Sequence, residues 1–110
     1  LFKGLNKEIK VLQWHSYEVI DLPSTTNLLA SSADCNVQAF SFENAFGLQF
    51  HVEQTNETVP QWACVPEYKS ALENTLGANA LEKFKKDVEM NLKQFNNSAR
   101  IIYDNFKKII

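Results

Sequence analysis

Residues 37–53 carry the sequence VQAFSFENAFGLQFHVE. Residues 37–42 show the two-residue period of a β-strand, with one face made of Val37, Ala39 and Ser41 and the other of Gln38, Phe40 and Phe42. Residues 43–45 form a short connection, and residues 46–53 make a second predicted strand, one face of which holds Leu48, Phe50 and Val52. Connections this short join antiparallel strands, so the sequence predicts a hairpin here.

Two earlier segments extend this strand-rich part toward the N-terminus. Residues 9–14 are rich in β-branched and aromatic side chains, and residues 28–32 are a short apolar run that ends in serines. Turn-forming sequences at residues 21–26 and 33–36 bound the second segment. We therefore predict strands at both places, antiparallel pairing of the last three strands, and a strand-rich part that spans residues 7–53.

The pattern becomes helical in residues 55–110. Residues 58–61 place a Thr three positions before a Gln with Pro60 between them, which predicts a helix start. Residues 66–76 predict a second helix that Gly77 stops.

A third predicted helix has the clearest pattern. Asn79 with Glu82 three residues later resembles a capping box. Apolar residues then recur at helical spacing, namely Leu81, Phe84, Val88, Leu92 and Phe95. We expect the sequence NNS at residues 96–98 to end this helix and a fourth helix to follow over residues 99–110.

Composition narrows the classes of function. The chain has 110 residues, of which 45% are hydrophobic and 22% charged, as in an ordinary globular domain. Its net charge of −2 offers no field to attract nucleic acid or an anionic membrane. No apolar run approaches the roughly 18–20 residues of a membrane-spanning helix, and the first residues show no secretory signal pattern. We expect a cytoplasmic protein with neither nucleic-acid nor membrane partners.

The two cysteines, Cys35 and Cys64, form no CxxC pair and so imply neither a zinc site nor a disulfide framework. A metal site built from both histidines, Glu53 and a cysteine fits no compact ligand spacing. We therefore expect no metal and no cofactor.

Candidate chemistry lies at the end of the last predicted strand. Because residues two apart in a strand face the same side, His51 and Glu53 project together. A neutral imidazole there could take a proton from a nucleophile, and a carboxylate beside it would fix its tautomer and favour the imidazolium. The pattern His-x-Glu is short, and a surface polar pair at a strand end also produces it.

Three segments together resemble the C-terminal half of a class I glutamine amidotransferase domain. They are VLQWHSYEVIDLP at residues 11–23, LASSADCNVQAF at residues 29–40 and GLQFHVE at residues 47–53. The family pattern reads W-H-x-x-x-V-x-x-L-P, then L-A-S-S, then Q-A-F, then G-x-Q-F-H-P-E. Its order and spacing agree with this sequence over roughly the first half of the chain. Within the family, the chain looks most similar to stand-alone proteins related to the amidotransferase domain of GMP synthase.

This resemblance implies glutamine as the substrate and a Cys-His-Glu triad. A cysteine attacks the side-chain amide of glutamine, ammonia leaves, and the thioester is hydrolysed to glutamate. His51 would be the triad histidine and Glu53 the carboxylate that orients it. His15 and Ser16 match a loop near the glutamine pocket of relatives and are candidate substrate-side residues, but for His15 a buried structural role is the favoured interpretation.

The sequence departs from the family pattern in two ways. Val52 stands where relatives usually have proline, which alters local stiffness rather than chemistry. The nucleophile is missing, because relatives carry it on a Gly-x-Cys-x-Gly elbow upstream of the histidine and no such elbow occurs here. Cys35 and Cys64 lack flanking glycines and are interpreted as small buried thiols.

The implied fold is α/β, the C-terminal portion of a flavodoxin-like domain with a mostly parallel central sheet. Residues 1–110 would be a single partial domain that exposes a sheet edge and apolar helix faces. Its expected partners are the missing N-terminal segment of the same domain, a second copy of itself, or a synthetase. Alone, the chain would be inactive. Two other functions stay open: a γ-glutamyl hydrolase or peptidase of the same fold, and a non-catalytic amidotransferase-like binding module.

Overall fold

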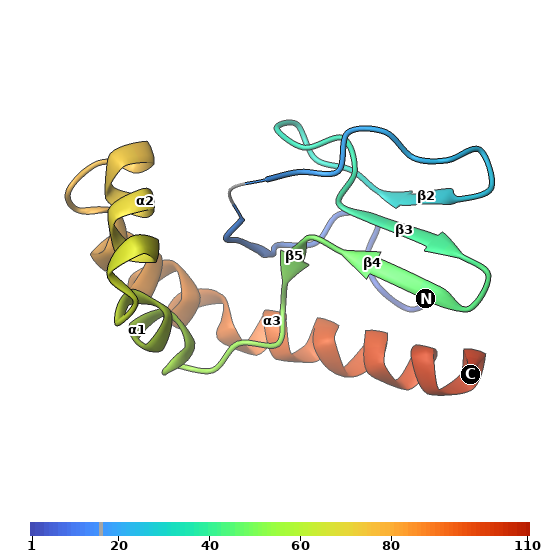
Figure 1. The fold of residues 1–110 in the computed structure, drawn as a ribbon. Coiled ribbons are helices and arrows are strands. Elements are labelled where there is room, and N and C mark those ends of the chain that lie inside the picture. The colour runs from blue at the N-terminus through green and yellow to red at the C-terminus, as the bar shows by residue number, and fades with distance from the viewer. Residues whose placement is uncertain (16) are drawn as a thin grey trace.

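The structure, a computed structural model, describes residues 1–15 and 17–110. Strands come first and helices follow, which confirms the predicted α/β class (Figure 1). The strands are β1 (Leu12–Gln13), β2 (Asn27–Ala30), β3 (Ala39–Phe42), β4 (Ala45–Leu48) and β5 (Phe50–His51). The helices are α1 (Thr58–Ala63), α2 (Pro66–Leu76) and α3 (Ala80–Ile109).

The strands form two separate antiparallel sheets. β2, β3 and β4 make a three-stranded meander in chain order, whereas β1 pairs with β5. The predicted antiparallel pairing of neighbouring strands is thereby confirmed for the meander. Every strand pair within the described residues is antiparallel, so the parallel sheet expected of an intact domain has no counterpart in this part of the chain.

Residues 46–53 do not form the single strand that the sequence predicts. The chain leaves the meander after β4 and joins β1 as β5, and Gln49 lies at the crossing. The backbone N–H of Gln49 donates to the carbonyl of Gln38 at 2.8 Å. Its side-chain amide donates to the Val37 carbonyl and accepts from the Val19 N–H at 3.1 Å. These bonds satisfy backbone groups that have no strand partner at the bend, and so they hold the corner between the two sheets.

The crossing at Gln49 divides the apolar face that the sequence predicts for residues 46–53. Phe50 and Val52 are buried, with 6% and 5% of their surfaces exposed, but Leu48 on the other side of the bend is 38% exposed. β1 is likewise shorter than predicted, because its partner β5 offers only two residues for pairing.

Gly47 in β4 lies directly opposite Phe40 in β3. A Cβ atom added to Gly47 would come within 2.5 Å of the tip of the Phe40 ring, so the ring covers the glycine. Aromatic cover over a cross-strand glycine is a recurring device in antiparallel sheets. This contact joins the second and third of the family-like segments.

The helical part differs from the prediction at residues 96–98. α3 continues through them without interruption, where two helices were expected. The sequence NNS contains neither Gly nor Pro, and Asn and Ser each cost only about 0.5 kcal/mol relative to Ala in a helix. Phe95 and Ser98 are both buried, and Ala99 packs against the same core, so the apolar stripe runs through the predicted break. Burial of that stripe outweighs the weak local preference.

Helix ends follow the sequence in part. α2 ends before Gly77, whose φ of +100° favours glycine, as predicted. Asn79 is the N-cap of α3, but its side chain makes no capping hydrogen bond, so the predicted capping box is not formed. α1 begins at Thr58, with Glu57 as its N-cap.

The core lies between the sheets and α3, which passes below both of them in Figure 1. Its buried members are Leu12, Ala39, Phe50, Val52, Val59, Val88 and Phe95. Near the C-terminal end of α3, the Phe106 ring packs edge-on against Phe46 of β4 at 6.1 Å. The side-chain amide of Asn105 donates to the carbonyls of Leu1 and Lys3, at 2.7 Å each, and so ties the N-terminal segment to α3. No helix in the described part of the chain is both long and apolar enough to span a membrane.

Candidate active site

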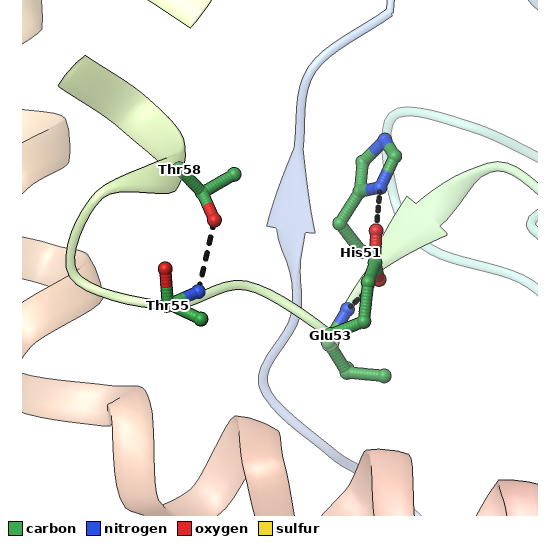
Figure 2. A network of polar contacts seen from close by, with 5 residues as sticks. His51, Glu53, Thr55 and Thr58 are labelled. Atoms are coloured by element: carbon green, nitrogen blue, oxygen red, sulfur yellow. Dashed lines mark hydrogen bonds and ion pairs between the residues drawn. The ribbon is translucent and has the colours of Figure 1, made fainter. Parts of the chain in front are cut away.

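His51 and Glu53 lie at the end of β5, with their side chains together as the two-residue spacing predicts. The buried Phe50 fixes the inward face of β5, so the His51 ring is directed toward the other face, where 30% of it is exposed. Its Nδ1 atom lies 2.7 Å from Oε1 of Glu53 (Figure 2). The other carboxylate oxygen, Oε2, accepts the backbone N–H of Val52 at 2.9 Å. Both oxygens of one carboxylate are thus engaged, one by the imidazole and one by the backbone.

This geometry selects one tautomer of His51. A carboxylate only accepts hydrogen bonds, so Nδ1 carries a proton and donates it to Glu53. In the neutral ring, Nε2 then bears the lone pair, and Figure 2 shows it pointing away from Glu53. Among residues 1–15 and 17–110, no polar group of the chain bonds to Nε2. The site therefore presents a proton acceptor toward the outside.

Glu53 is held in its ionised form. Partial burial raises the pKa of its carboxyl, but the hydrogen bond from His51 and the backbone hydrogen bonds from Glu53 and Val52 together hold the pKa below its ordinary value. An ionised carboxylate beside the ring stabilises positive charge on the imidazole. The arrangement can orient a general base and support its protonated form.

An aromatic cluster backs the His51 ring. Trp62 of α1 packs edge-on against His51, with ring centroids 5.0 Å apart and planes at 68°. Trp14, which follows β1, packs edge-on against Trp62 at 5.3 Å, and Phe84 of α3 lies 5.7 Å from Trp14. Nothing in the sequence connects either tryptophan with His51. His51 and Trp62 are eleven residues apart, and the chain changes from strand to helix between them. No local sequence pattern therefore predicts their contact.

His15 is exposed, so the buried structural role considered from the sequence is wrong. Its Nδ1 bonds to the Tyr17 carbonyl at 2.7 Å and its Nε2 to the Gln13 side-chain amide at 2.9 Å. It borders a surface hollow of about 390 Å³ whose other walls include Trp14 and Tyr68. Both partners lie two residues from His15 in the sequence, so these bonds hold the ring without linking it to His51. Ser16, the other predicted substrate-side residue, lies outside the described residues.

Neither cysteine is placed to act with His51. Cys35 is buried, as predicted, and burial raises the pKa of its thiol, as do the hydrogen bond and charge of Glu18. Its Sγ donates to the Val37 carbonyl at 3.4 Å. Cys64 is exposed, which corrects the expectation of a buried thiol, and its Sγ donates to the Pro60 carbonyl within α1 at 3.3 Å. Within the described residues neither thiol contacts His51, and each donates to a backbone carbonyl close to it in the sequence.

Gln54, directly after Glu53, is a buried amide that the sequence did not single out. Only 1% of its surface is exposed, and within the described residues neither its Oε1 nor its Nε2 has a hydrogen-bond partner. Across the same residues, no three His, Cys, Asp or Glu side chains lie close enough together to hold a metal ion.

Comparison with known proteins points to one family. The family model described as glutamine amidotransferase class-I matches residues 1–61. A glutamine-hydrolyzing GMP synthase subunit from Methanosphaera stadtmanae is 42% identical over 55 residues, which are 48% of this chain and 30% of that protein. The corresponding subunit from Saccharolobus solfataricus is 42% identical over 55 residues, 48% of this chain and 29% of its own. That from Thermoplasma acidophilum is 44% identical over 55 residues, 48% of this chain and 28% of its own.

The chain spans about three tenths of the length of these relatives. No solved structure is significantly similar to it. The family match nevertheless covers more than half of the 110 residues, takes in every described strand, and includes both His51 and Glu53. The match includes the segments QAF (residues 38–40) and GLQFH (residues 47–51) that carry the resemblance in the sequence. The chain therefore belongs to the class I glutamine amidotransferases and is similar to those of GMP synthase.

Proposed function

We propose that this chain supplies the histidine and carboxylate of a Cys-His-Glu triad that hydrolyses glutamine to glutamate and ammonia. The observation that carries the proposal is the 2.7 Å contact between His51 Nδ1 and Glu53 Oε1, which leaves Nε2 open at a half-buried ring. The cysteine comes from a Gly-x-Cys-x-Gly elbow in a polypeptide segment outside this sequence. The chain is then a partial domain whose strand-rich part, residues 7–53, bears the pair and whose helical part, residues 55–110, supports it.

In this reaction each group has one task. Nε2 of His51 takes the proton of the thiol, and the thiolate attacks the side-chain carbonyl carbon of glutamine. The carbon–nitrogen bond breaks, and His51 returns the proton to the nitrogen, which leaves as ammonia. Water, deprotonated by the same imidazole, then attacks the thioester and releases glutamate and the thiol. Glu53 keeps Nδ1 protonated throughout and stabilises the imidazolium that forms twice in the cycle.

The expected partner follows from the relatives. Their names describe part of a glutamine-hydrolysing GMP synthase, so we propose that the ammonia passes to a synthetase protein or domain that aminates its substrate. Exposed apolar side chains on the meander support further association, including Leu28 and Phe42 at 54% and 45% exposure. A cytoplasmic location is part of the same proposal.

A glutaminase assay tests the proposal in the full-length protein, with the upstream segment present. We expect His51→Ala to abolish ammonia release, and Glu53→Gln to weaken it less, because the amide still holds the ring but no longer stabilises its charge. The 110-residue chain alone should release no ammonia above background. Normal turnover in the His51→Ala protein would remove the triad assignment.

Two further measurements separate the other functions. Comparing glutamine with γ-glutamyl peptides as substrates of the full-length protein distinguishes an amidotransferase from a γ-glutamyl hydrolase. Reading the upstream coding sequence for Gly-x-Cys-x-Gly distinguishes either enzyme from a non-catalytic binding module.

A further inference from the structure

Among the described residues, the His51 ring has a polar contact with Glu53 and an aromatic contact with Trp62, and the triad accounts only for the first. Glu53 fixes the ring through a single hydrogen bond from a side chain that is 64% exposed. An exposed hydrogen-bonded pair of this kind is weakened by water and by the freedom of both side chains. The bond defines which nitrogen carries the proton, but by itself it restricts rotation about the His51 side-chain torsions only weakly.

The second neighbour is Trp62, whose indole packs edge-on against the imidazole at 5.0 Å. Trp62 belongs to α1, which the chain reaches after it reverses direction beyond β5 (Figure 1). Trp62 lies one residue beyond the segment that matches the family model. The contact is therefore an observation of this structure and not a consequence of the family match.

Trp62 is itself held firmly. The turn before α1 is closed by two threonines. The Thr55 N–H donates to Thr58 Oγ1 at 2.9 Å (Figure 2), and the Glu57 N–H donates to Thr55 Oγ1 at 3.2 Å. On its other side, the indole packs against Trp14, and Trp14 against Phe84 of α3. The indole is thus packed between the imidazole and Trp14, and it gives the His51 ring a contact besides the hydrogen bond to Glu53.

We propose that Trp62 is a positioning residue for His51: its indole confines the imidazole to the one rotamer in which Nδ1 meets Glu53 and Nε2 faces the nucleophile. This inference rests on the proposed function for its catalytic meaning, but its structural core can be measured without any reaction. Trp62 touches neither the thiol nor the glutamine in this scheme, and it acts only through His51.

The first test uses nuclear magnetic resonance on the 110-residue chain. Three-bond couplings of the His51 side chain report its χ1 rotamer, and the ¹⁵N shifts of its ring report the tautomer. We expect one rotamer and an Nδ1–H tautomer in the unchanged chain, and an average over rotamers with a mixed tautomer in Trp62→Leu. Trp62→Phe, which keeps an aromatic face, should restore most of the order.

Phe84→Leu is the matched control, because it removes an aromatic ring of the same cluster that does not touch His51. It should leave the His51 rotamer and tautomer unchanged. Equal disorder of His51 in Trp62→Leu and Phe84→Leu would show that Trp62 is only part of the core and would overturn the proposal. If Trp62→Leu does not fold, Trp62→Met, which also lacks a ring but fills more of the space, takes its place: rotamer averaging of His51 in Trp62→Met with an ordered His51 in Phe84→Leu supports the proposal, and an ordered His51 in both overturns it.

The second test uses the full-length protein. Trp62→Leu should lower kcat about tenfold with little change in KM, since misplacing a general base weakens the transition state more than substrate binding. Trp62→Phe should recover most of the loss. A full loss of activity in His51→Ala with no rotamer change in Trp62→Leu would refute the role of Trp62 and leave the triad intact. Rotamer disorder in Trp62→Leu with normal activity in His51→Ala would refute the triad instead.

Discussion

Glu53 divides its carboxylate between two donors, the imidazole of His51 and the backbone N–H of Val52. The backbone bond comes from the preceding residue, so it turns the carboxylate back along the chain toward the ring. Asp has one methylene group fewer, which shortens its reach toward these two donors. The two-residue spacing and the length of the Glu side chain together determine the pair.

The charge of Glu53 predicts a pH dependence of stability. Because the folded-state pKa lies below its ordinary value, the pair contributes stability that is present above about pH 4.3 and is lost as the pH falls through the folded pKa. Since Glu53 is largely exposed, we expect a contribution of well under about 1 kcal/mol. Urea unfolding of the unchanged chain and Glu53→Gln at pH 6 and pH 3 should show a difference in unfolding free energy that shrinks in acid. A difference that stays constant or grows would contradict it.

At the scale of single residues, the sequence predicted that His51 and Glu53 lie together, but it did not predict the residues that pack around them. The spacing of His51 and Glu53 along a strand is a local property, and so it can be read from two residues. Trp62 reaches His51 only because α1 folds back past β5, and Gln54 becomes buried only through the packing of the whole chain. Contacts of that kind depend on elements that local patterns do not place relative to one another.

Among the elements, the meander depends on the cover that Phe40 gives to Gly47. The glycine leaves room for the ring, and the ring shields the backbone that the missing side chain exposes. The QAF and GLQFH segments are therefore packing partners as well as sequence features.

Gly47→Ala should destabilise the chain by about 1–3 kcal/mol, because the added methyl group forces the Phe40 ring out of its place. Thermal unfolding measures the loss. In a Phe40→Ala background, Gly47→Ala should lower the free energy of unfolding only a little, since no ring remains to be displaced. The difference between the two backgrounds measures the contact between residue 47 and the Phe40 ring. An equal cost of Gly47→Ala in both backgrounds would show that the ring is not responsible.

Two elements show where the sequence prediction failed. At residues 96–98, three residues with a modest preference against helix predict a break, but the buried stripe on either side of them keeps α3 continuous. At residues 46–53, the alternation suggested one strand, but the hydrogen bonds of Gln49 turn the chain into another sheet. In both cases tertiary contacts outweighed a local pattern.

Over the whole molecule, α3 joins parts that are distant in sequence. Its N-terminal half carries Phe84 beneath the aromatic cluster, and its C-terminal half packs against β4 and the N-terminal segment. At 1.5 Å per residue, a helix of 30 residues is about 45 Å long. α3 therefore serves as the common support of the site and the meander.

Asn105→Ala should release the N-terminal segment from α3. It removes two hydrogen bonds, to the carbonyls of Leu1 and Lys3, and should cost about 1–2 kcal/mol. Hydrogen exchange of the amides in residues 2–5 should quicken as the melting temperature falls. Asn96→Ala, an exposed position on the same helix, should change neither, and a similar response in both variants would contradict the role of Asn105.

The fold class and the family could be predicted from the sequence because they rest on the first half of the chain, where the motifs lie. The helical half has amphipathic patterns but no motif, and so its helices were expected while their continuity and their contacts were not. The expected association with a missing segment, a second copy or a synthetase stays a prediction.

The two tryptophans of the sequence, Trp14 and Trp62, lie against each other, and one of them touches His51. Part of the ultraviolet light absorbed by indole in this chain is therefore emitted by a ring that packs against the imidazole. Because an imidazolium quenches indole emission more strongly than the neutral ring does, the intrinsic fluorescence of the unlabelled chain is an optical gauge of the charge on His51.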